Sequence, residues 1–397
     1  MNLRATSGNP GTESLGGGSA LAGFLLSGFL MALLGAILPA WGYHRDPPDF
    51  VAVGNYFLSL AVGLVAATMS ARPIMQRRGI GFVLVLACGI AAAALAYLGL
   101  VGPPRPSGWR ILGLLVLGMS AGLLNVGLFN AISGSYTSDA AGTVSRGGVW
   151  YGLGCLAATI LVEGAFYAPP SVILWLMAGF PLVFGILYAR RPPAMPPPMP
   201  HPKVREALGD FRSVGAILFA LLLFFQFGNE WSIAGWLPIF LCHRVRVSPQ
   251  EALFTLALYW FCLMTGRLGA IALLPRVRHR TLLFGSLLSA LFGMLVLYST
   301  DNLFGSITGV VFLGAGYASI YPLVAEAIGR RFPYFHPGFF NGIFSLALLG
   351  GLLAPATLGY LASALGVDVV ISIPLLGTFI VMGLLLLIWL ESKVTGR

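Results

Sequence analysis

Residues 224–241 read FFQFGNEWSIAGWLPIFL and place one acidic residue, Glu230, in the middle of an apolar stretch. The stretch belongs to a longer apolar run from Val214 to Leu241, which is long enough to cross a lipid bilayer. An ionised side chain at the centre of a membrane costs about 2.5 kcal/mol or more, and such residues usually mark a pathway for ions or solutes. The run therefore predicts a membrane helix, and Glu230 is the first candidate for a functional residue.

The composition predicts that most of the protein surface faces lipid. Of the 397 residues, 57% are hydrophobic and 9% are charged, whereas soluble domains have about 25% charged residues. The formal net charge of +10 does not indicate a nucleic-acid partner, because the basic residues lie in short loops between apolar runs. The four cysteines, Cys88, Cys155, Cys242 and Cys262, show neither metal-ligand spacing nor a disulfide framework.

Twelve apolar runs of about 20 residues predict twelve transmembrane helices. They cover residues 20–42, 50–71, 79–101, 110–132, 143–167, 171–189, 213–241, 250–274, 281–299, 303–328, 337–364 and 369–390. A proline-rich break at 190–212, which includes PPAMPPPMPHP, is extended and separates six runs from six. The predicted fold class is an all-α membrane protein with two six-helix bundles, at residues 20–189 and 213–390.

The charge distribution predicts the orientation, because cytoplasmic loops collect Lys and Arg. Most of the 23 Lys and Arg residues lie on the predicted side that holds both termini and the proline-rich segment. We therefore expect a disordered cytoplasmic tail at 1–19, a cytoplasmic linker at 190–212 and a cytoplasmic tail at 391–397. No secretory signal and no Asn-x-Ser/Thr acceptor is present, which is consistent with the inner membrane of a bacterium.

The two halves of the chain resemble each other in two places. VGLVAATMSARPIMQRR in the second run aligns with TGRLGAIALLPRVRHR in the eighth, which matches Gly63 with Gly266. GMSAGLLNVGLFNAISG in the fourth aligns with GAGYASIYPLVAEAIGR in the tenth, which matches Asn130 with Glu326. Together with the division into six and six, these matches indicate a parallel duplication. Transporters built in this way bind their substrate between the halves and rock one half against the other.

Four stretches resemble the major facilitator superfamily, and within it the fucose–galactose–glucose:proton symporter group. They are GNEWSIAGWLP, LMTGRLG, GAGYASIYPLVAEAIG and GGLLAPATLGYLA, in the seventh, eighth, tenth and eleventh runs. The resemblance implies the major facilitator fold and solute transport by alternating access. The symporter group carries acidic residues in its first and fourth helices, whereas this chain has none in the first run and has Asn125 and Asn130 in the fourth.

Proton coupling is assigned to Glu230, with Arg267 as the second residue of the site. Arg267 is the only basic residue deep within a predicted membrane run, and it needs an acidic partner because arginine cannot lose its charge. Glu230 and Glu326 are both candidates for this partner. Three roles are open for Arg267: a member of a fixed structural ion pair, a member of a gate pair that breaks in one state, or a cation that recognises an anionic solute. A proton gradient is the expected energy source, and sodium is the open alternative.

Several polar and aromatic residues within the runs are candidate solute contacts. An amide either hydrogen-bonds a neighbouring helix or recognises solute hydroxyl groups, and an aromatic ring can stack on a sugar or on any apolar solute. These candidates are Asn125, Asn130, Gln226, Asn229, Trp231, Tyr317 and Tyr321.

The sequence thus predicts a monomeric secondary active transporter that moves a small polar organic solute, such as a sugar, together with protons. The chain carries no HExxH, GxSxG or P-loop motif, so we expect neither enzyme activity nor a cofactor nor a bound metal. Two alternatives keep the same fold. One is an exporter of amphipathic compounds or lipids, and the other is an uncoupled facilitator or a non-transporting membrane receptor.

Overall fold

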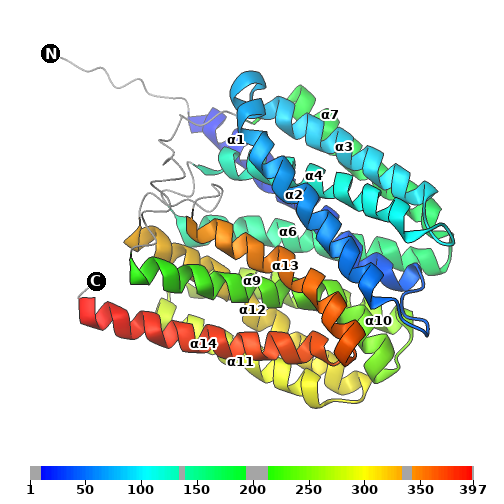
Figure 1. The fold of residues 1–397 in the computed structure, drawn as a ribbon. Coiled ribbons are helices and arrows are strands. Elements are labelled where there is room, and N and C mark those ends of the chain that lie inside the picture. Colours follow the sequence, from blue (N-terminus) through cyan, green and yellow to red (C-terminus); the bar gives the residue numbers. More distant parts are fainter. Residues whose placement is uncertain (1–9, 134–138, 194–212, 333–341, 396–397) are drawn as a thin grey trace.

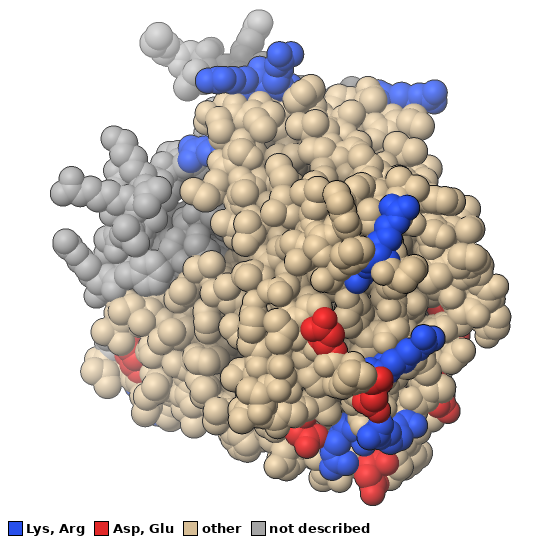
Figure 2. All heavy atoms as spheres, turned by 45° about the vertical axis from the view of Figure 1, so that its right-hand side comes forward, with Lys and Arg blue, Asp and Glu red and all other residues tan. Residues whose placement is uncertain are grey.

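A computed structural model describes residues 10–133, 139–193, 213–332 and 342–395. Within these residues it contains twelve helices that are long and apolar enough to cross a membrane, in agreement with the predicted all-α membrane fold. Large apolar side chains lie exposed along these helices, including Leu176 at 69% and Leu376 at 61% exposure. Figure 2 shows uncharged residues over most of the face it presents, with the charged side chains in a few groups. Such a surface suits contact with lipid.

The helices of each half lie side by side in a bundle (Figure 1). The first half contains α1 (Pro10–Ala40), α2 (Phe50–Arg78), α3 (Ile80–Leu100), α4 (Ser107–Ala131), α6 (Ala140–Glu163) and α7 (Pro170–Arg190). The second half contains α9 (Val214–Phe240), α10 (Pro249–Leu273), α11 (His279–Ser299), α12 (Leu303–Arg331), α13 (Gly342–Leu365) and α14 (Val369–Thr395). Short helical turns follow α6 at Gly164–Phe166 and α9 at Leu241–Val245.

Helices continue beyond the apolar runs at both ends of the described chain. The disordered tail predicted for 1–19 includes residues 10–19, which form the start of α1. Proline is tolerated at the first helical position, and extending a helix that the apolar run has already nucleated costs little. The tail predicted for 391–397 is helical to Thr395, where α14 ends. Residues 194–212, which hold most of the predicted linker, lie outside the described residues.

The helix pairings of the first half recur in the second. In the first half α2 packs on α4, α1 on α6 and α3 on α7; in the second α10 packs on α12, α9 on α13 and α11 on α14. A Cβ at Gly63 would run into the α4 backbone at Leu115, and one at Gly266 would lie 2.7 Å from the Cβ of Ala318 in α12. The two aligned glycines therefore occupy equivalent helix crossings, as expected for a duplicated fold.

The two halves contact each other at one end of the molecule. We call the end where α1 begins and α14 ends the termini end, and the opposite end, with the loops 41–49, 241–248 and 366–368, the far end (Figure 1). At the far end the Tyr360 hydroxyl of α13 donates to Oδ1 of Asn55 in α2 over 2.5 Å. His243 Nε2 lies 3.3 Å from the carbonyl oxygen of Tyr43. These contacts join the two halves and close the far end.

Candidate functional site

A cavity of 170 Å³ lies between the two halves. Helices α1, α2, α4 and α6 line it from the first half, and α9, α10, α12 and α13 from the second. The lining residues are Phe24, Met31, Leu64, Asn125, Phe129, Ile132, Thr143, Val144, Gly147, Gly148, Tyr151, Phe227, Glu230, Trp231, Arg267, Tyr321 and Leu348. Ile132 directly follows α4, and Thr143 lies in the first turn of α6, so the lining reaches toward the termini end.

Glu230 and Arg267 form an ion pair in the wall of this cavity. Oε1 of Glu230 in α9 lies 3.5 Å from Nη2 of Arg267 in α10, and both side chains are buried, at 7% and 6% exposure. Of the two acidic partners that the sequence left open for Arg267, the structure therefore has Glu230. The attraction between these two buried charges offsets part of the free energy that burying each one costs.

Arg267 also connects the two halves. Its Nη1 donates to the carbonyl oxygen of Gly148 in α6 over 2.8 Å. Its Nε is buried and has no hydrogen-bond partner among the described residues. The guanidinium is thus held between an acid of its own half and a backbone carbonyl of the other half, with part of its donor capacity unused.

Glu326 lies apart from Arg267, so the alternative pair between these two residues is not the one observed. Its carboxylate pairs with Arg330, one helical turn further along α12, and its Oε1 is 3.2 Å from Nδ1 of His279 at the start of α11. Glu326 lies near the end of α12, beside the arginine-rich α10–α11 connection, and does not line the cavity.

The two asparagines of α4 have different surroundings. Asn125 lines the cavity, and its Oδ1 accepts a hydrogen bond from the Ser27 hydroxyl of α1 over 2.6 Å. Asn130 donates from Nδ2 to the carbonyl oxygen of Val126 in its own helix over 2.8 Å and does not line the cavity. Asn125 is therefore the better placed of the two to contact a solute.

Three other predicted solute contacts lie outside the cavity lining. Asn229 faces α14, with its side-chain amide 3.4 Å from Oγ1 of Thr378, and the Tyr317 hydroxyl lies 3.5 Å from the same Oγ1. Gln226 is buried, and its Nε2 has no partner among the described residues. The polar stretch around Glu230 thus divides over two faces of α9, because successive residues of a helix point in different directions.

Trp231 and Tyr321 do line the cavity, as a solute contact requires. The Tyr321 ring meets the ring of Phe227 edge to face, with centroids 4.9 Å apart. Phe24 and Phe129 meet in the same way on the opposite wall, at 5.0 Å. Aromatic rings therefore cover both sides of the cavity.

Sequence reasoning missed the contribution of α6. The carbonyl oxygen of Gly148 accepts a hydrogen bond from Arg267, and Tyr151, one turn further along α6, lines the cavity. The consecutive glycines Gly147 and Gly148 signal close packing in the sequence, but the arginine that they receive belongs to the other half of the chain. No group of three or more His, Cys, Asp or Glu residues in the described part of the chain is placed to hold a metal ion.

The chain is similar to two curated membrane proteins, while no family model matches it. An uncharacterized MFS-type transporter of Yersinia pestis is 24% identical over 349 residues, which cover 85% of this chain and 87% of that protein. The membrane protein MosC of Rhizobium meliloti is 23% identical over 164 residues, which cover 41% of this chain and 40% of MosC.

Solved structures show the same fold. The major facilitator superfamily transporter FucP, in its outward conformation, matches with a TM-score of 0.67 and 14% identity over 94% of this chain and 98% of that one. A mutant of the nucleoside transporter NupG matches with a TM-score of 0.70 and 15% sequence identity, and the match covers 94% of this chain and 99% of NupG. A mutant of the fucose:proton symporter FucP of E. coli matches with a TM-score of 0.63 and 12% sequence identity, and the match covers 94% of this chain and 98% of FucP.

The chain therefore has the major facilitator superfamily fold, as the resemblance implied. The solved neighbours and the Yersinia pestis relative are described as transporters, in agreement with the expectation that this chain is not an enzyme.

Proposed function

We propose that this protein is a secondary transporter that carries a small organic solute through the central cavity by alternating access. The observation that carries the proposal is that both halves line one cavity, which holds a buried ion pair whose arginine also binds the other half. A site shared between two rocking halves is exposed first on one side of the membrane and then on the other.

The described contacts correspond to a state that is closed at the far end. The Tyr360–Asn55 hydrogen bond joins the halves there, whereas the cavity lining reaches toward the termini end. With both termini cytoplasmic, as the distribution of Lys and Arg favours, this state faces inward. We place the protein as a monomer in the inner membrane of a bacterium.

We assign proton coupling to Glu230. Among the described residues its ionic contact is with Arg267, at 3.5 Å, so a proton on the carboxylate would weaken this contact and loosen the hold on the arginine. In proton-coupled transport, Glu230 would bind and release a proton in each cycle. Each change would alter the position of Arg267 and so its hydrogen bond to Gly148 of α6. Sodium remains the alternative coupling ion, and an uncoupled facilitator follows if the pair stays fixed.

The cavity lining favours a solute less polar than a sugar. A hexose carries several hydroxyl groups, and each one buried without a partner costs about 1–3 kcal/mol. Asn125 is already bonded to Ser27, and aromatic rings cover much of the remaining wall. The same lining supports the second candidate function, an exporter of amphipathic compounds.

Reconstitution into proteoliposomes tests the proposal. We expect solute-dependent counterflow for at least one member of a panel of labelled sugars, nucleosides, organic acids and hydrophobic dyes, and a pH gradient should drive net uptake. Glu230→Gln should keep counterflow but lose the response to the gradient. Absence of counterflow across the whole panel would contradict the proposal, and gradient-driven uptake by Glu230→Gln would remove Glu230 from the coupling mechanism.

A further inference from the structure

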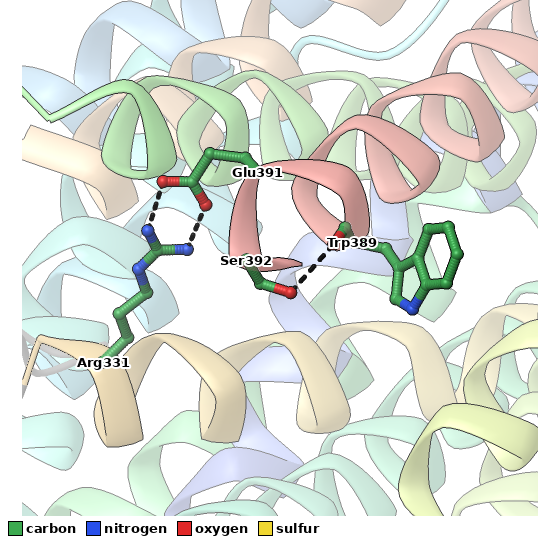
Figure 3. A network of polar contacts seen from close by, with 4 residues as sticks. All are labelled: Arg331, Trp389, Glu391 and Ser392. Carbon is green, nitrogen blue, oxygen red and sulfur yellow. Dashed lines mark hydrogen bonds and ion pairs between the residues drawn. The ribbon is translucent and has the colours of Figure 1, made fainter. Parts of the chain in front are cut away.

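The buried Glu230–Arg267 pair differs from a second, partly buried ion pair in the same chain. Figure 3 shows Arg331 at the end of α12 presenting two nitrogens to both carboxylate oxygens of Glu391 in α14. Such a bidentate arrangement is the strong form of an arginine–carboxylate contact. Glu230 instead offers one oxygen at 3.5 Å, and Arg267 keeps a buried Nε without a partner in the described structure. The cavity pair is therefore the one whose contact is easier to exchange.

The rest of the cavity indicates the size and character of its occupant. A cavity of about 150 Å³ lined by apolar side chains can hold benzene, and this one measures 170 Å³. Phe24, Phe129, Trp231 and Tyr321 present rings to it. The space and its walls thus fit one ring or a branched apolar group of similar size, with the charged pair at one side.

The two members of the pair respond differently to an incoming charge. Arg267 remains positive, whereas Glu230 can become neutral by taking up a proton. The titratable groups that act electrostatically on or with Glu230 are Tyr151 and Cys155 of α6, Tyr259 of α10 and Tyr317 of α12, besides Arg267 itself. Phenols and thiols are mostly uncharged near neutral pH. Once Glu230 is protonated, the site therefore carries one positive charge and attracts one anion.

We propose that the cavity takes a small apolar monocarboxylate, whose carboxylate replaces that of Glu230 at Arg267 while Glu230 takes up one proton from the solvent. This inference rests on the proposed transport function and specifies its substrate class. The contact between Arg267 and Glu230 breaks, the contact between Arg267 and the solute carboxylate forms, and the proton neutralises the released acid. The net charge of the site is the same before and after binding, so the bound proton and anion cross the membrane together without moving net charge.

Calorimetric binding of benzoate to the purified full-length protein tests the proposal, with benzamide as the neutral analogue of the same shape. Titrations in buffers of different ionisation enthalpy report the number of protons taken up. We expect about one proton per bound benzoate, and a dissociation constant that rises about tenfold per pH unit above the pH where Glu230 ionises. Benzamide should bind at least tenfold more weakly than benzoate and take up no proton. Equal binding of the two compounds, or benzoate binding without proton uptake, would overturn the proposal.

Two variants separate the role of each charge. Glu230→Gln should bind benzoate with the same affinity from pH 6 to pH 8 and without proton uptake, because its side chain is already neutral. The double variant Glu230→Gln/Arg267→Gln leaves no unpaired charge to prevent folding, and it should lose the preference for benzoate over benzamide. The exposed Arg276→Gln at the termini end is the matched control and should behave as the wild type. Retention of the preference in the folded double variant would contradict the assignment to Arg267.

Transport measurements distinguish failure of this inference from failure of the transport function. Counterflow of a neutral solute by a protein that does not prefer benzoate would refute the monocarboxylate and leave the transporter intact. If benzoate is transported, a pH gradient of one unit should accumulate it about tenfold, and a membrane potential imposed with potassium and valinomycin should not. Accumulation driven by the potential would refute the one-to-one exchange of charges described above.

Discussion

Replacing Gly148 by alanine should displace Arg267 from the position in which it joins the two halves. A Cβ added at Gly148 would lie 2.6 Å from Nη1, 2.7 Å from Cδ and 2.9 Å from Cζ of Arg267. Favourable contacts between such atoms begin at about 3.5 Å, so the guanidinium has to move by about 1 Å. The hydrogen bond from Nη1 to the Gly148 carbonyl oxygen, now 2.8 Å long, would be stretched beyond its useful range.

The expected magnitude follows from two opposing contributions. A hydrogen bond to a charged group contributes about 1.5–3 kcal/mol, whereas alanine is about 1 kcal/mol better than glycine inside a helix. Gly148→Ala should therefore lower the free energy of unfolding by about 0.5–2 kcal/mol. Gly147 provides the matched control on the same helix, because its added Cβ would lie 3.5 Å from the Phe24 ring, which is an ordinary contact distance. Gly147→Ala should be as stable as the wild type or up to about 1 kcal/mol more stable.

Unfolding of both variants in mixed micelles with increasing SDS, followed by tryptophan fluorescence, measures this difference. The reasoning requires Gly148→Ala to unfold at lower SDS than Gly147→Ala, with a gap of about 0.5–3 kcal/mol between them. Equal stability of the two alanine variants would show that Arg267 finds an equivalent partner nearby, and the connection between the halves described here would then be refuted.

Three further changes test the helix packing and the closure of the far end. Gly350→Ala places a Cβ against the backbone of α9, and it should reduce the yield of folded protein because two helix backbones have to separate. Arg331→Gln leaves the partly buried carboxylate of Glu391 without its bidentate partner, and should lower the free energy of unfolding by about 1.5 kcal/mol; a change below about 0.5 kcal/mol, on the order of a surface substitution, would contradict this. Tyr360→Phe removes the hydrogen bond to Asn55, which contributes about 1 kcal/mol to the state closed at the far end. The fraction of molecules that are open at the far end should therefore rise about fivefold. Alkylation of a cysteine introduced in the far-end half of α2 reports that population, and an unchanged rate would argue against closure by this bond.

The number of helices and their division into halves could be predicted from the sequence because lipid imposes the same requirement on every segment. Each spanning segment has to bond its own backbone and present an apolar surface, so twelve apolar runs are visible without any knowledge of their neighbours. The alignment of Gly63 with Gly266 also came from local sequence, and the structure gives both glycines equivalent helix crossings. Helix ends were less predictable, since α14 continues to Thr395 beyond its apolar run.

The sequence by itself determined that Glu230 and Arg267 lie inside membrane helices, because a charged residue within an apolar run is visible locally. Only the tertiary structure decided that Arg267 pairs with Glu230 rather than Glu326, and that its other donor reaches Gly148. It also decided that Trp231 faces the cavity while Asn229, two residues earlier, faces α14. The physical reason is that an α-helix turns each residue by about 100°, so the partner of a side chain depends on which helix packs against that face, and residues far apart in the sequence supply it.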